Sequence, residues 1–162
     1  MTDRIAAGPG VELPDPVDRP WRILATGFCF AMFGLGGLLL RLLVFPPLAL
    51  AVRDPARRAQ LARAAVHRSF RGFIELMRLC GVLRYEIVGR ERLNRRGLLV
   101  LANHPTLIDV VFLISLIEHA VCVVKAPLKR NPFTRGPVLG AGYICNDDPE
   151  GVVEDCRRAL DK

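Results

Sequence analysis

Residues 103–109 read Asn-His-Pro-Thr-Leu-Ile-Asp and place a histidine and a carboxylate five positions apart. A neutral imidazole can remove a proton from a hydroxyl group, and a nearby carboxylate can fix its tautomer and stabilise the imidazolium that forms. His104 is therefore the candidate general base, and Asp109 is its candidate orienting partner. Asn103 and Thr106, which flank this histidine, are candidate substrate-binding residues.

The spacing of this pair requires a helix that begins between its members. Five steps along an unbroken helix turn the chain by about 500° and leave the two side chains roughly 140° apart. Pro105 predicts the required start, because proline holds the preceding residue in an extended conformation and itself fits a first helical turn. His104 then lies outside the helix, folded back over Asp109. The positive helix end favours a neutral imidazole and an ionised carboxylate.

A second interpretation of Asp109 stays open. Thr106 and Asp109 have the spacing of a capping box, in which the carboxylate only satisfies a free backbone N–H group. A single histidine at the end of a strand also often has a purely structural role.

The elements around this segment predict an α/β fold with helices covering a sheet. Apolar runs too short for a helix read as strands, and the run just before His104 would put the pair at the carboxyl end of a strand, where ligands usually bind. The predicted order is strand 83–88, turn 94–97, strand 98–102, helix 106–118, strand 120–124, basic loop 125–137, strand 142–145 and helix 150–160.

The amino-terminal part of the chain predicts membrane association. Residues 23–40 contain no charged side chain, and the apolar run continues over residues 42–52 after Arg41. Eighteen uncharged residues are at the lower limit for a membrane span. Arg41 or the Pro46-Pro47 pair could instead divide the run into two short helices that enter and leave one leaflet. A cleaved signal peptide is disfavoured by the length of the run and by its late start.

Three regions follow from these patterns. Residues 1–20, with four prolines, are predicted to be a disordered arm, residues 21–52 a membrane-associated segment, and residues 53–162 an α/β domain that is incomplete at its carboxyl end. The domain begins with a predicted helix over residues 55–80, capped by Asp54 and ended by Gly81. This helix is amphipathic and rich in arginine, which suits either anionic lipid headgroups or a solvated face.

The charge distribution orients the membrane segment. Residues 53–96 contain twelve arginines and four acidic residues, a net of +8 beside the apolar run. Positive flanks mark the cytoplasmic side, so the His104 segment is expected to face the cytoplasm, at a membrane of the bacterial inner-membrane type. The five cysteines fit that compartment as reduced thiols. Nucleic acid is not an expected partner, because the basic residues lack interleaved aromatic side chains for base stacking.

With these residues assembled, the chain resembles the glycerolipid acyltransferases typified by lysophosphatidic acid acyltransferase. Their first motif, Asn-His followed by four residues and Asp, matches Asn103, His104 and Asp109. Their second block has a lysine at the end of one strand and a glycine at the start of the next, as do Lys125 and Gly142 here. The similarity extends over about residues 83–160.

This resemblance implies transfer of a fatty acyl group from coenzyme A or acyl carrier protein to the hydroxyl of a lysolipid. His104 would act as the base in direct attack, without a further cofactor and without a metal. Lys125, Lys129, Arg135 and Gly142 would contribute to substrate binding, the basic ones by attracting a phosphate. Membrane lipids, the lysolipid acceptor and the acyl donor are the expected partners.

Two departures from the family pattern change the expectation. The second block continues into Asn146-Asp147-Asp148 where the family usually has a phosphate-binding arginine, which favours an acceptor with another headgroup. The third motif, Phe-Pro-Glu-Gly-Thr-Arg, is missing, so the chain is expected to be a fragment or truncated form. A catalytically silent membrane protein with the same fold is therefore an alternative. A hydrolase or metal site at His104 and Asp109 is a third, although no further ligand or nucleophile is visible.

Overall fold

The computed structural model of the chain describes residues 18–160, except residues 94, 96, 104, 105 and 148. This part is mostly helical, with a long apolar helix near the amino terminus and a small parallel sheet of two strands. The helices are α1 (Asp18–Leu39), α2 (Phe45–Ala51), α3 (Pro55–Leu79), α4 (Leu107–Leu116), α5 (Arg135–Gly140) and α6 (Pro149–Leu160); the strands are β1 (Val123–Val124) and β2 (Ile144–Cys145); and the shorter helical turns are η1 (Leu40–Val44), η2 (Arg90–Leu93) and η3 (Ala126–Lys129).

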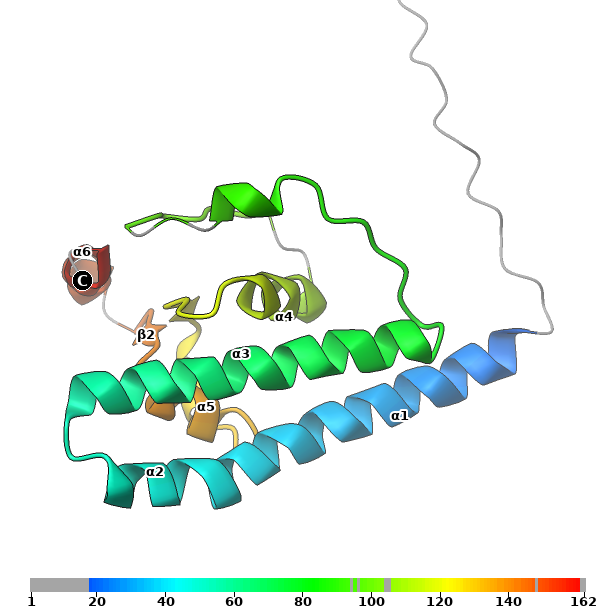
Figure 1. Cartoon of the computed structure of the whole chain (residues 1–162), viewed down its shortest axis with the longest axis horizontal. Helices are drawn as coiled ribbons and strands as arrows, with labels where there is room; N and C mark the ends of the chain where they lie inside the picture. The colour runs from blue at the N-terminus through cyan, green and yellow to red at the C-terminus, as the bar shows by residue number, and fades with distance from the viewer. Residues whose placement is uncertain (1–17, 94, 96, 104–105, 148, 161–162) are drawn as a thin grey trace, which may run out of the picture.

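The first half of the chain forms a helical hairpin. Helix α1 continues through the π-helical turn η1 into α2, and α3 then runs back beside α1 (Figure 1). The Phe33 ring contacts Phe73 and Phe70, with ring centroids 5.0 and 5.7 Å apart, and Ala25 and Cys29 are buried. The alternative in which Arg41 or Pro46-Pro47 divides the apolar run into two short helices is not seen: the run stays helical from Arg19 to Ala51, with a π-helical turn at Leu40–Val44. Residues 1–17 of the predicted arm lie outside the described residues.

Helix α3 begins and ends where local sequence signals predict. The Asp54 carboxylate accepts hydrogen bonds from the backbone N–H groups of Ala56 and Arg57, at 3.1 and 3.2 Å, and Pro55 occupies the first helical position. At the other end Gly81 has φ of +70°, a left-handed conformation that glycine adopts without steric cost. The prediction of a helix over residues 55–80 is confirmed.

We expect the Asp54→Ala variant to lose about 1 kcal/mol of unfolding free energy, the usual cost of removing a helix cap. Urea unfolding of detergent-solubilised protein, followed by circular dichroism, measures this loss. Arg53→Ala, one residue outside the cap, is the matched control and should change stability little. Equal losses in both variants would contradict the capping role of Asp54.

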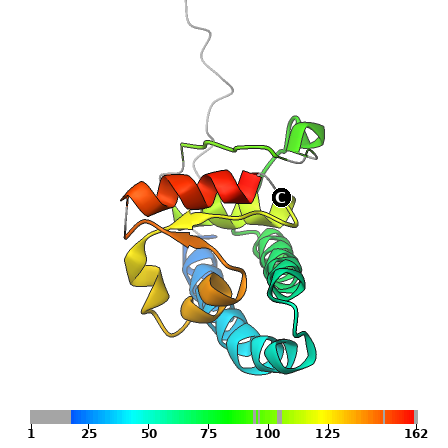
Figure 2. The same cartoon turned by 90° about the vertical axis from the view of Figure 1, so that its left-hand side faces the viewer.

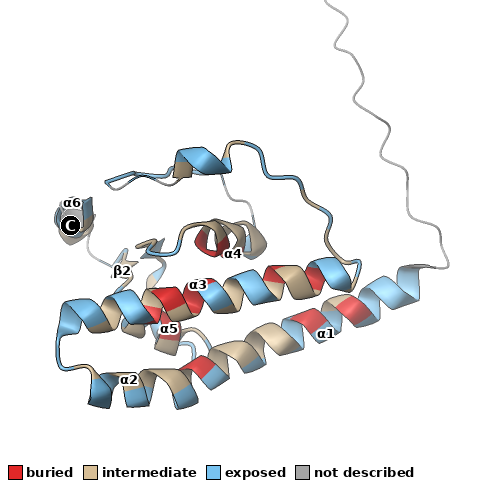
Figure 3. Ribbon diagram, viewed as in Figure 1, coloured by how far each residue is buried: buried red, intermediate tan, exposed pale blue. Residues whose placement is uncertain are grey.

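The interior lies where α1, α3, α4 and α5 face one another (Figure 3). Val66 of α3 is completely buried, and it forms a cluster with Ile114 of α4 and Leu40 of η1. His67 is also buried, and its Nδ1 atom hydrogen-bonds the Ile114 carbonyl oxygen at 2.8 Å. This bond ties α3 to α4 and satisfies a polar group that would be costly to bury alone.

The sheet consists of β1 and β2 in parallel, with Val123 beside Ile144 and Val124 beside Cys145. The Ile144 N–H donates to the Cys122 carbonyl, and the Asn146 N–H donates to the Val124 carbonyl, both at 3.0 Å. Helix α6 contacts β2, and Figure 2 views the molecule from this end. The strands predicted at 120–124 and 142–145 are confirmed, although each is shorter than predicted. The helix predicted at 150–160 is confirmed over its whole length.

Other parts of the predicted sheet are wrong. Residues 83–88 and 98–102 have no regular secondary structure (Figure 1), and they form no hydrogen-bonded ladder with any described strand. A strand is stabilised by hydrogen bonds to a neighbouring strand, and these segments pair with no strand among the described residues. Val88 and Leu101 within them are 88% and 86% exposed. The predicted basic loop at 125–137 is also wrong in part, because it contains η3 and the start of α5.

Candidate functional site

Of the candidate catalytic pair, His104 and Asp109, the structure describes only Asp109. His104 and Pro105 lie outside the described residues, so the predicted approach of His104 to Asp109 stays a prediction. Asp109 itself is half-buried in the first turn of α4. Helix α4 begins at Leu107, in agreement with the start predicted by the sequence.

Asp109 closes the amino end of α4. Its Oδ2 atom accepts a hydrogen bond from the Thr106 N–H at 3.0 Å and a second from the Thr106 hydroxyl at 2.8 Å. The capping interpretation of Asp109 is therefore confirmed. One carboxylate oxygen is used in this cap, and a carboxylate has a second oxygen able to accept a hydrogen bond from an imidazole N–H. Capping and orientation of a histidine are compatible roles for Asp109.

The other candidate substrate residues fall into two groups. Asn103 and Thr106 are exposed beside the amino end of α4. The second group lies around η3 and α5, and no hydrogen bond or ion pair joins it to the first group in the part of the chain that the structure describes. Its members are Lys125, Lys129, Arg135 and Gly142.

In this second group, Lys129 already has an anionic partner. Its Nζ atom lies 3.5 Å from Oδ2 of Asp147, and this carboxylate is the main cause that raises the pKa of Lys129. Nearby, the Asn146 side-chain oxygen accepts a hydrogen bond from the Ala126 N–H at 3.2 Å. Lys125 and Arg135 are exposed at the starts of η3 and α5. A ligand phosphate that binds Lys129 would have to displace the Asp147 carboxylate or lie beside this like charge.

Gly142 has a structural reason to be glycine. Its φ of +65° is left-handed, and a Cβ atom there would meet the Arg63 guanidinium at 3.7 Å. The Arg63 Nε donates to the Ala141 carbonyl at 2.9 Å, which ties α3 to the turn after α5. Burial lowers the pKa of Arg63 and raises the pKa of the neighbouring Cys122 thiol to about 11. Burial also raises the pKa of Tyr143, whose buried hydroxyl has no partner within the described residues.

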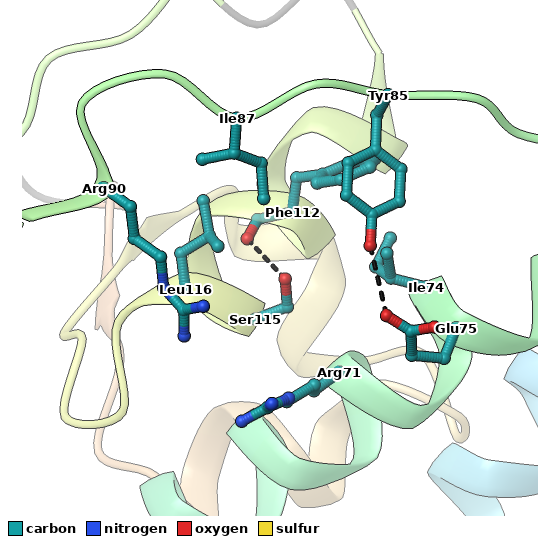
Figure 4. Close-up of a pocket in the computed structure, with 9 residues that line it drawn as sticks. All are labelled: Arg71, Ile74, Glu75, Tyr85, Ile87, Arg90, Phe112, Ser115 and Leu116. Carbon is teal, nitrogen blue, oxygen red and sulfur yellow. Dashed lines mark hydrogen bonds between the residues drawn. The ribbon is translucent and has the colours of Figure 1, made fainter. Parts of the chain in front are cut away.

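A pocket that the sequence did not predict lies between α3, α4 and the segment that follows α3 (Figure 4). Its empty volume is about 380 Å³, part of it open to solvent. Two hydrogen bonds organise its wall: the Tyr85 hydroxyl donates to Oε1 of Glu75 at 3.2 Å, and the Ser115 hydroxyl donates to the Phe112 carbonyl at 2.7 Å. Nine residues line it: Arg71, Ile74, Glu75, Tyr85, Ile87, Arg90, Phe112, Ser115 and Leu116.

In the sequence, Arg71 is one of several arginines of the predicted helix over residues 55–80. The spacing of Arg71 and Glu75, four residues apart on a helix, places both on one face and was an available signal. The contributions of Tyr85 and Arg90 had no such signal, because they depend on how the irregular segment 82–93 folds over α4.

The Glu75 carboxylate in this pocket is stabilised in its charged form. Its hydrogen bond from Arg78, at 2.9 Å, is the main cause that lowers the pKa of Glu75, and the Tyr85 hydroxyl adds to this effect. When a carboxylate has a lower pKa in the folded protein than in the unfolded protein, its ionised form stabilises the fold. This stabilisation is complete above the unfolded-state pKa and is lost as the pH falls through the folded-state pKa.

We therefore expect the Glu75→Gln variant to melt slightly below the wild type at pH 7 and to approach it as the pH falls below about 4.3, the usual pKa of glutamate. Thermal unfolding over a pH series measures the difference. Glu118→Gln is the matched control, because Glu118 is exposed and forms no ion pair with a described residue. A difference for Glu75→Gln that stays constant down to pH 2 would contradict the ion-pair explanation.

Among the described residues, no group of three histidine, cysteine or acidic side chains is placed to hold an ion. All five cysteines, which are described, are free thiols.

Comparison with known proteins adds no assignment. No protein family model, curated protein or solved structure matches this chain. The function is therefore inferred from the residues and their geometry.

Proposed function

We propose that this chain is a membrane-associated acyltransferase. It transfers a fatty acyl group from acyl-coenzyme A or acyl carrier protein to the hydroxyl of a lysophospholipid or related lysolipid. His104 removes the hydroxyl proton as the alcohol attacks the thioester, and Asp109 orients the imidazole and stabilises its charged form. The thiolate of the donor leaves and takes the proton, so the reaction needs no covalent acyl-enzyme.

The observation that carries this proposal is the position of Asp109 at the amino end of α4. The motif residues Asn103 and His104 immediately precede this helix, as the acyltransferase resemblance requires. Thr106 holds the Asp109 carboxylate through two hydrogen bonds, so the group that would orient His104 is itself fixed in place. Such fixed geometry is what a general base needs for efficient proton transfer.

Association with a membrane is supported by the amino-terminal helices. The stretch Arg19–Ala51 is long and apolar enough to cross a bilayer, a property that signal sequences and buried core helices can share. A buried core helix is disfavoured here, because the outer face of this stretch is exposed. Its exposed large side chains are Trp21, Ile23, Leu24, Phe28, Phe30, Leu35, Leu39, Leu42, Leu43 and Leu50.

The hairpin geometry favours a helix that lies in the membrane surface over one that crosses it. Helix α3 packs beside α1, so a crossing α1 would carry α3 into the hydrocarbon layer (Figure 1). Arg68, Arg71 and Arg78 are exposed on α3, and each arginine at the bilayer centre costs about 2.5–3.5 kcal/mol on insertion scales. An in-plane α1 buries its apolar face and leaves these arginines at the cytoplasmic headgroups of a bacterial-type inner membrane.

The acceptor headgroup is inferred from the region after β2. Asp147 neutralises Lys129, and Asn146 is used in a structural bond to Ala126. Asp147 therefore reduces the positive charge that Lys129 can offer to a phosphate monoester, while Lys125 and Arg135 remain exposed. We infer an acceptor with another headgroup, such as a phosphodiester, glyco- or amino-lipid.

A catalytically silent membrane protein is the second candidate, and the cap on α4 is the observation that favours it. Asp109 has a structural role that would preserve it without catalysis. The two candidates differ in one test. Vesicles that contain a lysolipid and the purified chain are supplied with radiolabelled acyl donor, and the diacyl product is separated by thin-layer chromatography. Product that depends on His104 supports the acyltransferase, and its absence with folded, vesicle-bound protein supports the silent form.

A further inference from the structure

The pocket between α3, α4 and the segment after α3 has a chemistry that the proposed acyl transfer does not use. Arg71 enters it from α3 and Arg90 from the start of η2, so two guanidinium groups from different elements line one pocket (Figure 4). Neither arginine forms an ion pair or a side-chain hydrogen bond with another described residue. Each presents five N–H donors in a planar fork suited to phosphate oxygens.

The remaining polar groups of the pocket already have partners. Among the described residues, Glu75 is the one carboxylate of the lining, and Arg78 and the Tyr85 hydroxyl donate hydrogen bonds to it. The Ser115 hydroxyl donates to the Phe112 carbonyl. Arg71 and Arg90 are exposed, and they are the charged donors of this lining that have no partner among the described residues. Two free guanidinium groups beside one paired carboxylate favour an anion.

The rest of the lining is apolar. Ile74, Ile87 and Leu116 contribute aliphatic side chains, and the Tyr85 ring packs edge-on against Phe112 with centroids 4.8 Å apart. Apolar walls lower the local dielectric constant, which strengthens the attraction between a guanidinium and an anion. They also favour a ligand that has an apolar part beside its charged group.

We propose that this pocket binds the phosphate group of an amphiphilic phosphate ester, held between Arg71 and Arg90. The empty space of about 380 Å³ includes open solvent, and the cavity itself is about 80 Å³. It therefore admits a phosphate group, while the rest of the ligand would lie outside it. The proposal does not depend on acyl transfer, because none of the lining residues belongs to the Asn103–Asp109 motif. A catalytically silent protein would bind the same group.

The site is tested by isothermal titration calorimetry of the full chain in detergent micelles. Three probes separate the sources of phosphate: inorganic phosphate, glycerol 3-phosphate, and a short-chain lysophosphatidic acid below its critical micelle concentration. We expect saturable binding that weakens with added salt, tightest for the lysolipid. Equal affinity for the lysolipid and inorganic phosphate would overturn the amphiphile assignment, and no saturable binding of any probe would overturn the site.

Two variants localise the binding. Arg71→Gln with Arg90→Gln should weaken the lysolipid affinity by about tenfold or more, because charge-assisted hydrogen bonds from two guanidinium groups are lost. Arg92→Gln is the matched control, two residues from Arg90 and absent from the pocket lining, and should change affinity less than about twofold. Arg90→Gln alone changes a single exposed position. If the double variant misfolds, the loss of affinity is measured in this single variant instead. An equal loss in Arg92→Gln, or no loss in the double variant, would overturn the proposal.

Discussion

Replacing His104 with alanine is expected to lower the rate of acyl transfer by about 10²- to 10⁴-fold, the usual contribution of a positioned general base. The substrate hydroxyl then has to lose its proton to water while it attacks the thioester. His119→Ala is the matched control, because His119 is exposed in the turn after α4 and should leave the rate unchanged. Initial rates with radiolabelled donor and vesicle-borne lysolipid measure both variants. An unchanged rate for His104→Ala would show that the proposed mechanism is wrong.

Asp109 requires variants that separate its cap from its proposed role in catalysis. Asp109→Ala removes the acceptor for both Thr106 bonds, so stability and rate should fall together. Asp109→Asn keeps an oxygen that can accept from the Thr106 N–H but removes the charge that stabilises an imidazolium. A large loss of rate with little change in melting temperature is expected for Asp109→Asn. A rate that follows stability in both variants would assign Asp109 to the cap alone.

Placing charge on the outer face of the amino-terminal helices should abolish most membrane binding. Leu24 and Leu43 are 70% and 66% exposed, and burying each leucine in the membrane contributes about 1.5–3 kcal/mol. The double variant Leu24→Asp with Leu43→Asp is therefore expected to lower the vesicle partition coefficient by about 10²- to 10⁴-fold. Vesicle sedimentation measures this coefficient. Gln60→Asp, at an exposed position of α3, is the control and should change the coefficient little.

The same preparation distinguishes a helix in the membrane surface from one that crosses. With an in-plane α1, protease added outside sealed vesicles should digest an amino-terminal tag and a carboxyl-terminal tag equally. Protection of the amino-terminal tag alone would show that α1 crosses the bilayer. Unchanged vesicle binding of the double leucine variant would contradict the assignment of this face to the membrane.

The parts of the fold that could be predicted are those controlled by local interactions. Helix α3 follows from Asp54, Pro55 and Gly81, whose effects act within one turn of the chain. The start of α4 at Leu107 follows from the capping residues before it. The strands at 83–88 and 98–102 could not be decided in this way. A strand needs a partner remote in sequence, and the apolar composition of these segments carried no information about one.

The candidate site shows the same division. The cap between Thr106 and Asp109 was one of two interpretations offered by their spacing, and the structure contains it. The pairing of Lys129 with Asp147 joins residues eighteen positions apart and depends on the parallel pairing of β1 and β2, so spacing alone could not reveal it. The pocket of Arg71 and Arg90 likewise depends on the irregular path of the chain after α3.

The most direct measurement is acyl transfer by the purified chain on vesicles that contain lysolipid, with acyl-coenzyme A and acyl carrier protein offered as separate donors. If His104 is the base of an acyltransferase, labelled diacyl product accumulates in proportion to the wild-type protein. His104→Gly then lacks this activity and partly regains it with added imidazole. Folded, vesicle-bound wild-type protein that forms no product with either donor, across lysolipids of several headgroups, would contradict the proposed function.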